Sequence, residues 1–266
     1  MKKSTKTSIV TGVVIVVIGV VVLLCALAMS GWNFSKVDNW EQNTFTTDAD
    51  VTTLAIEVDV GEVVIHRSNA SNIVVNYDYN DQYTPTFEEN VAGVLSIETA
   101  KKNWYQFNFW FEKAPTIEIE IPQDCSPDIV LVLNAGKVAF GDGDWGELID
   151  VTLNAGVLLM GNVEVKTMYL DINAGAFDAN KIECDLFRCS ISAGTANVKK
   201  LDSNKVSLNV SAGAVELRLA GAQMDYNATV SVSAGSCNIE SNSYYVAKRY
   251  LNVDVSAGSV EIGFIN

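Results

Sequence analysis

Hydrophobic and polar positions alternate through the C-terminal half of the chain, and the alternation is centred on a repeated tripeptide that ends in Ala-Gly. Seven copies occur, at Asn134–Gly136, Asn154–Gly156, Asn173–Gly175, Ser192–Gly194, Ser211–Gly213, Ser233–Gly235 and Ser256–Gly258. Successive glycines are 20, 19, 19, 19, 22 and 23 residues apart. A nearly fixed period of this length is typical of one structural unit stacked on itself, and it predicts a solenoid.

Counted from each glycine, apolar residues fall at positions −5, −3, +2 and +4, as in Leu131, Leu133, Val138 and Phe140. Such alternation predicts strands that bury one face. Because the inward positions change from odd to even at the glycine, each unit is predicted to be a strand, a corner, a second strand and a turn. We expect the Asn or Ser at −2 to hydrogen-bond to its counterpart in the next unit. Asp59–Gly61 is interpreted as a degenerate eighth copy.

The predicted fold class is all-β: a single-stack parallel β-solenoid of about seven or eight coils, preceded by one N-terminal transmembrane helix. Antiparallel hairpins are the alternative, and identical corners at near-constant spacing argue against them. Residues 71–121 break the period, and their strand-like runs are expected to cover the N-terminal end of the stack. We place the first coil and the cap strands at 51–130 and the repeat solenoid at 131–266.

An uncharged run rich in Val, Ile and Leu occupies residues 9–29. At about 1.5 Å per residue it is long enough to cross the hydrocarbon layer. Three lysines precede it, which predicts a cytoplasmic tail at 1–8, a juxtamembrane linker at 30–50 and a C-terminal domain outside the cytoplasm. A cleaved signal peptide is the alternative, but the run exceeds the roughly 7–15 apolar residues of such signals. A lipoprotein is disfavoured by Leu24, which precedes Cys25 where these signals carry a small residue.

The formal net charge is −14, and residues 31–266 carry 15 basic against 32 acidic side chains. An acidic surface repels phosphate backbones, so no nucleic-acid partner is predicted. No cysteine spacing or histidine cluster indicates zinc. Cys184 and Cys189 are close enough in sequence for a local disulfide, whereas Cys189 and Cys237 fall at inward positions. Core packing is the preferred interpretation of these two.

One glycine-rich turn and two aromatic clusters are candidate sites. The turn carries three acids that could hold calcium, with a solvated turn as the preferred interpretation and no other cofactor predicted; these acids are Asp142, Asp144 and Glu147. The first aromatic cluster either binds a partner or plugs the end of the solenoid; its candidates are Trp104, Phe107, Phe109 and Trp110. The second lies in the last long loop, where partner sites tend to occur; its candidates are Tyr244, Tyr245, Lys248, Arg249 and Tyr250.

The membrane segment, the opening strand pair Leu54–Ile65 and the repeated Ser/Asn-Ala-Gly units resemble the bacterial putative-adhesin family. The resemblance covers about residues 50–266. It implies a β-solenoid ectodomain and an association with cell-envelope stress systems in Gram-positive bacteria. It carries no catalytic signature and transfers no functional residue.

These observations predict a non-enzymatic, single-pass membrane protein whose solenoid binds an envelope polymer or envelope protein, with membrane lipid contacted through residues 9–29. No nucleophile motif or phosphate-binding loop is present, and the one histidine, His66, has no motif around it. The alternative is a carbohydrate-active β-helix enzyme that would use Asp178 or Glu216 on a partly acidic face. A purely structural spacer is a third hypothesis.

Overall fold

A column of eight glycines organises the fold. The structure is a computed structural model, and it describes residues 40–47, 50–80, 83–101 and 114–265. These residues form one sheet of thirteen strands. The strands are β1 (Glu41–Thr46), β2 (Thr53–Ser68), β3 (Val74–Tyr79), β4 (Tyr83–Glu89), β5 (Val94–Lys101), β6 (Thr116–Pro122), β7 (Asp128–Phe140), β8 (Gly143–Asp144), β9 (Leu148–Leu153), β10 (Gly156–Glu164), β11 (Thr167–Ala220), β12 (Tyr226–Cys237) and β13 (Arg249–Ile265).

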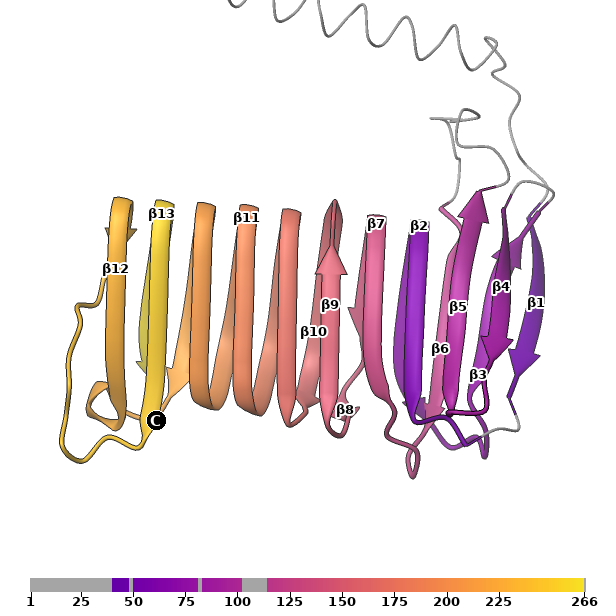
Figure 1. Cartoon of the computed structure of the whole chain (residues 1–266), viewed down its shortest axis with the longest axis horizontal. Helices are drawn as coiled ribbons and strands as arrows, with labels where there is room; N and C mark the ends of the chain where they lie inside the picture. The colour runs from indigo at the N-terminus through magenta and orange to yellow at the C-terminus, as the bar shows by residue number, and fades with distance from the viewer. Residues whose placement is uncertain (1–39, 48–49, 81–82, 102–113, 266) are drawn as a thin grey trace, which may run out of the picture. The chain divides into compact units, whose positions relative to one another are not determined.

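The repeated units stack in parallel register, and each is called here the layer of its glycine. Gly61 pairs with Gly136, Gly136 with Gly156, and Gly156 with Gly175. β11 bends through three corners without interruption, and its glycines follow in the same column at close approach. The chain is therefore all-β and β-solenoid-like, as predicted, and the degenerate copy at Gly61 does occupy a layer (Figure 1).

The layers do not follow sequence order at the C-terminal end. Gly258 pairs with Gly213 on one side and with Gly235 on the other. The strand order is accordingly β11-β13-β12, and the yellow β13 lies between the two orange strands in Figure 1. The last unit of the sequence is thus inserted next to last in the stack, and β12 forms the end.

The core is built from the predicted inward positions. Side chains at −5, −3, +2 and +4 are buried in seven of the eight layers. The exception is the Gly235 layer, where Val232 is 41% exposed and Val230 and Cys237 are half-buried. A buried layer is covered by a neighbour on each side, whereas this one has β13 on one side only. Burial therefore follows position in the stack and not the residue type.

The polar column at −2 forms a hydrogen-bonded ladder, as predicted. Ser192 donates to Asn173 at 3.5 Å, and Asn173 donates to Asn154 at 2.7 Å. Asn154 donates in turn to Asn134 at 2.7 Å, which donates to Asp59 at 3.0 Å. An ionised carboxylate only accepts hydrogen bonds, so Asp59 sets the direction of the whole ladder. The ladder ties each layer from that of Gly136 to that of Gly194 to the one before it.

Antiparallel strands cover the N-terminal end. β5 and β6 continue the stack by pairing in parallel with β2. β3 then pairs antiparallel with β6, and β1 antiparallel with β3. Phe45 and Phe87 stack at 4.5 Å between ring centroids and pack against the core. The described strands of the segment 71–121 cover this end, as expected, and β1 extends the cap into the predicted linker at 30–50.

The predicted transmembrane segment 9–29 lies outside the described residues. Within the described part of the chain, no helix is both long and apolar enough to cross a membrane.

The four cysteines among the described residues are free thiols, so Cys184 and Cys189 form no disulfide in this structure. Cys189 is fully buried at its inward position, whereas Cys237 is half-buried because its layer is the last.

Candidate functional site

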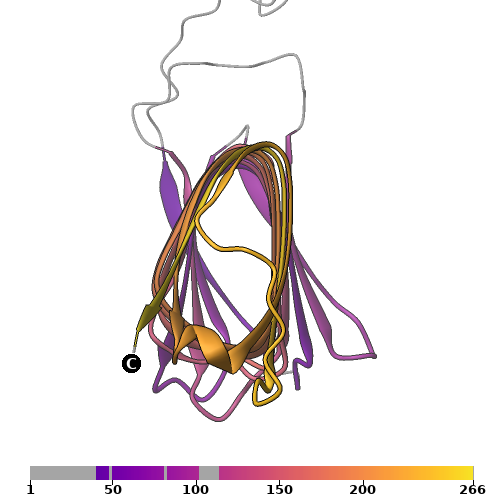
Figure 2. The same cartoon turned by 90° about the vertical axis from the view of Figure 1, so that its left-hand side faces the viewer.

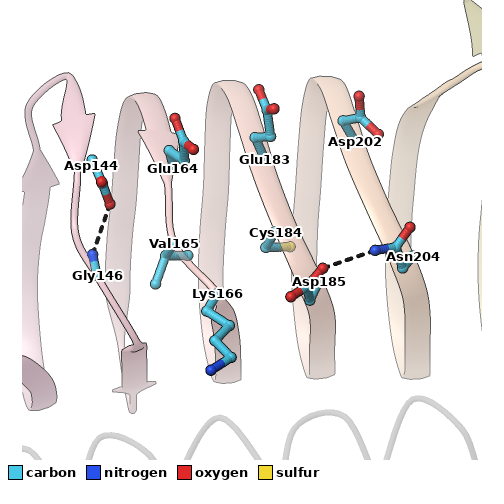
Figure 3. Close-up of a pocket in the computed structure, with 10 residues that line it drawn as sticks. All are labelled: Asp144, Gly146, Glu164, Val165, Lys166, Glu183, Cys184, Asp185, Asp202 and Asn204. Atoms are coloured by element: carbon cyan, nitrogen blue, oxygen red, sulfur yellow. Dashed lines mark hydrogen bonds between the residues drawn. The ribbon is translucent and has the colours of Figure 1, made fainter.

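A groove of about 390 Å³ crosses several consecutive layers of the stack (Figure 3). Half of its lining residues are acidic, and we call it the acidic groove. The lining residues are Asp144, Gly146, Glu164, Val165, Lys166, Glu183, Cys184, Asp185, Asp202 and Asn204.

Four acids of the groove come from position +8 of consecutive layers. Glu164 of β10 pairs with Asp144 of β8 on one side and with Glu183 of β11 on the other. Asp202 follows one period later in β11. Because strand side chains alternate, the buried neighbour Val165 turns inward and leaves Glu164 facing the solvent. The repeat itself therefore produces a row of carboxylates about 4.8 Å apart from layer to layer.

Three cations partly offset this charge: Lys166, which lines the groove, and two that contact lining acids. Lys181 contacts Glu183 at 2.6 Å, and Arg249 contacts Asp202 at 2.7 Å. The hydrogen bond that Lys181 donates to Glu183, together with the charge of that carboxylate, raises the pKa of the Lys181 ammonium. The lining retains Asp144, Glu164 and Asp185 as further acids, so the groove keeps a net negative charge. Its electrostatics favour a cationic partner.

Cys184 lies between the carboxylates in Figure 3. Its side chain belongs to the inward set and is buried. Burial raises the pKa of the thiol to about 11, so the thiol is neutral near pH 7. Because the thiolate is the reactive form, Cys184 has the properties of a core residue and not of a nucleophile.

The three acids predicted to hold calcium are engaged separately. Asp142 accepts hydrogen bonds from the backbone and side-chain amides of Asn162 at 2.7 and 2.8 Å, and these bonds lower the pKa of the Asp142 carboxyl. Asp144 accepts from a backbone N–H two residues later at 2.9 Å, and Glu147 contacts Lys166 at 2.7 Å. No group of three metal-ligating side chains occurs among the residues described, so the calcium prediction gains no support.

Three tyrosines of the last long loop are exposed, as a partner site requires. Tyr244 and Tyr250 are 37% and 56% exposed, and Tyr245 projects fully into solvent. Lys248 is also exposed. Tyr244, Tyr245 and Lys248 lie in the loop that follows β12, whereas Tyr250 belongs to β13 and pairs with Lys205 and Asn227 on its two sides. The end of the stack formed by β12 is therefore a candidate interaction surface.

Arg249 was grouped with these residues by the sequence, but the structure places it in an internal network. Its guanidinium contacts Asp202 at 2.7 Å and donates to the backbone carbonyl of Ala220 at 2.8 Å. It also donates to the Tyr226 hydroxyl at 2.9 Å and lies over that ring. This network ties the inserted β13 to the end of β11 and to β12.

The first aromatic cluster lies outside the described residues; its members are Trp104, Phe107, Phe109 and Trp110. The two acids of the enzyme hypothesis are held by neighbouring side chains. Asp178 accepts a hydrogen bond from Asn197 at 3.2 Å, and Glu216 accepts one from Arg218 at 2.9 Å. The two carboxylates belong to different layers, those of Gly175 and Gly213, with the Gly194 layer between them.

The sequence interpretation missed the acidic groove, although the signal was present. Asp144, Glu164, Glu183 and Asp202 recur at the same 20- and 19-residue intervals as the glycines. Extending the numbering of each repeat from +4 to +8 places these four acids at one position. Their convergence follows from parallel in-register stacking alone.

The stacked all-β architecture defines a β-solenoid-like domain, and the comparisons identify its family. The family model described as Toastrack DUF4097 matches residues 51–264. The chain therefore belongs to the Toastrack DUF4097 family, a domain of unknown function, and its resemblance to the putative-adhesin group is confirmed. No curated protein matches the chain.

Solved structures that are similar to this chain come from bacteria. A putative adhesin from Parabacteroides merdae is 13% identical with a TM-score of 0.51, covering 87% of this chain and 98% of its own. A putative cell adhesion protein from Clostridium sporogenes is 16% identical with a TM-score of 0.42, covering 85% and 100%. A putative lipid binding protein from Parabacteroides distasonis is 14% identical with a TM-score of 0.34, covering 87% and 98%. At these identities the likeness concerns the fold alone.

Proposed function

We propose that this protein is a non-enzymatic binding module of the cell envelope, anchored in the membrane by residues 9–29 and displaying its stack outside the cytoplasm. The acidic groove carries the proposal. It presents one carboxylate from each of four consecutive layers along a single line, so it suits an extended partner better than a compact one.

The charge of the groove specifies the chemistry of that partner. A segment with several Lys or Arg side chains in a row would lie along the carboxylates and gain one ion pair from each layer it passes. Exposed ion pairs contribute only about 0.2–1 kcal/mol each. The affinity therefore depends on several pairs acting together and decreases with salt. We propose a basic, extended segment of an envelope protein as the ligand.

Binding of a fluorescent oligolysine peptide to the full-length chain in lipid nanodiscs tests the groove. The double variant Glu164→Gln/Glu183→Gln removes two acids without changing their size. The matched control is Asp171→Asn/Asp254→Asn, which removes two exposed acids from position −4. We expect the groove variant to weaken binding by about tenfold and the control to leave it near wild type.

Equal loss in both variants would mean that only overall charge matters and would refute the groove as the site. Soluble wall-polymer fragments provide a second comparison. If they bind saturably and more tightly than the peptide, the ligand is a polymer and the proposed protein partner is wrong. Neither result depends on the anchor, which needs its own test.

The topology is tested by an epitope tag placed after residue 266. On intact cells the tag should be accessible to antibody and to added protease, whereas a tag at residue 1 should be protected.

The proposed connection with envelope stress predicts that deletion of the gene changes the response of a cell-envelope stress reporter to a wall-active antibiotic. An unchanged response would remove that part of the proposal.

A further inference from the structure

The C-terminal end of the stack has an open strand edge. Among the described strands, β12 pairs only with β13, on one side. On its other side the described contacts are the bridge from Ala228 to Asn242 and hydrogen bonds between Val230 and the Ser241 hydroxyl. The loop after β12 therefore covers the first part of this edge, and in Figure 2 it crosses the end of the stack.

The remainder of the edge, Ser231–Cys237, presents backbone groups in the direction of the next layer. Ala228 and Val230 direct both N–H and C=O away from β13, since both groups bond to the loop. Backbone groups alternate in direction along a strand, so Val232 directs its N–H and C=O the same way. This edge is a template for one more strand.

The side chains of this layer also lack the cover that their counterparts have. Val232 is 41% exposed, whereas Val210 and Val255 at the same position are 0% and 3% exposed. Tyr245 and Val246 add fully and largely exposed apolar surface in the loop that covers the start of β12, where the backbone N–H of Tyr244 donates to Asn227. We call this combination, residues 231–237 with Tyr244–Val246, the end surface.

The charge distribution separates the end surface from the rest of the molecule. Residues 226–248 contain one acid, Glu240, and one base, Lys248, in a chain of net charge −14. Edge strands that must remain unpaired are usually protected by lysine, proline or a bulge. β12 has no charged residue and no proline: its sequence is YNATVSVSAGSC. Nothing in its sequence opposes pairing.

We propose that the end surface binds the end surface of a second copy of this chain. Two strongly acidic molecules repel each other over most of their surfaces, and a neutral end lets them meet without that repulsion. A two-fold axis normal to the sheet relates the two copies and reverses the strand direction of the second copy. The two β12 strands therefore pair antiparallel, and the side chains that face the core in each copy still face the core. The contact uses the same surface on both copies and closes as a dimer.

The test combines molecular mass with hydrogen–deuterium exchange on the full-length chain in detergent micelles. Mass alone could reflect association through residues 9–29, so the exchange of peptide 229–237 locates the contact. We expect the mass to double and this peptide to gain protection together as the concentration rises from roughly 1 to 100 μM.

Ser233→Lys and Ser211→Lys form a matched pair, because both serines are exposed at position −2, one in the end layer and one inside the stack. Ser233→Lys should weaken dimerisation at least about tenfold, since two-fold symmetry brings the new charges together, whereas Ser211→Lys should not. Val232→Lys is a second variant, whose ammonium can reach solvent from its partly open position.

A monomer at all concentrations overturns the proposal. So does a dimer that persists in both end-surface variants without protection of peptide 229–237. Protection that requires an added envelope protein would assign the edge to a different partner and also overturns it. These outcomes are independent of peptide binding in the acidic groove.

Discussion

Adding one methyl group to a glycine of the column is predicted to lower the free energy of unfolding by an unusually large amount. In Gly194→Ala the new Cβ would lie 2.0 Å from the carbonyl oxygen of Gly175, whereas ordinary contact begins at 3.4 Å. Position 194 also has a φ of 152°, which L side chains rarely adopt. The neighbouring backbone would have to retreat by more than 1 Å, and that movement strains the hydrogen bonds between the layers.

The size of this loss of stability follows from backbone strain and from steric overlap. A residue in a strained backbone conformation costs about 1–3 kcal/mol. Overpacking a tight interior costs about 1–3 kcal/mol, and here the obstacle is backbone that cannot rotate away. We therefore expect Gly194→Ala to lower the free energy of unfolding by about 3–5 kcal/mol, which is a large part of the stability of an ordinary domain.

Guanidinium denaturation of the full-length chain in micelles, followed by far-ultraviolet circular dichroism, measures this loss. Gly263→Ala is the control, since its Cβ would meet nothing closer than 3.6 Å and its backbone is not strained. The control should change stability by less than about 0.5 kcal/mol. If Gly194→Ala costs less than about 1 kcal/mol, or no more than the control, the close approach described here is wrong.

Two further predictions concern the ladder and the core thiols. Asn154→Ala removes the 2.7 Å hydrogen bonds to Asn134 and from Asn173 and should cost about 1–2 kcal/mol by the same denaturation assay; a loss no larger than that of the exposed Asn209→Ala would contradict a stabilising ladder. Burial raises the pKa of the Cys189 thiol to about 12, above the roughly 8.5 of an unfolded cysteine. The folded state therefore holds the proton more tightly, and this stabilisation is complete at neutral pH and is lost as the pH rises from about 8.5 towards 12. Between about pH 7 and 9.5 the wild type should lose about 1.4 kcal/mol more than Cys189→Ala, and parallel pH profiles would exclude the linkage.

The alternation of residue types was enough to predict the layers. Leu131, Leu133, Val138 and Phe140 are all buried, and the same positions are buried in six further layers. The corner at each glycine followed from the change of parity there. Local spacing carries this information because each layer contacts only its neighbours.

The order of the last layers could not be predicted in the same way. The Gly235 and Gly258 units share Ser-Ala-Gly and similar apolar positions, so either could lie next to the Gly213 layer. Only the longer spacings of 22 and 23 residues indicate a departure, because the extra residues let the chain step past one layer and return. The internal role of Arg249 depends on that arrangement and was missed with it.

Insertion of β13 between β11 and β12 affects how the chain matures during synthesis. Within the repeats from β7 to the end of β11, each layer docks on a layer that has already left the ribosome. Residues 226–237 do not, because their pairing partner is residues 249–260, which are translated later. The end of the stack therefore closes only after residues 249–260 have been translated, and a chain truncated after residue 240 would hold β12 without its β13 neighbour.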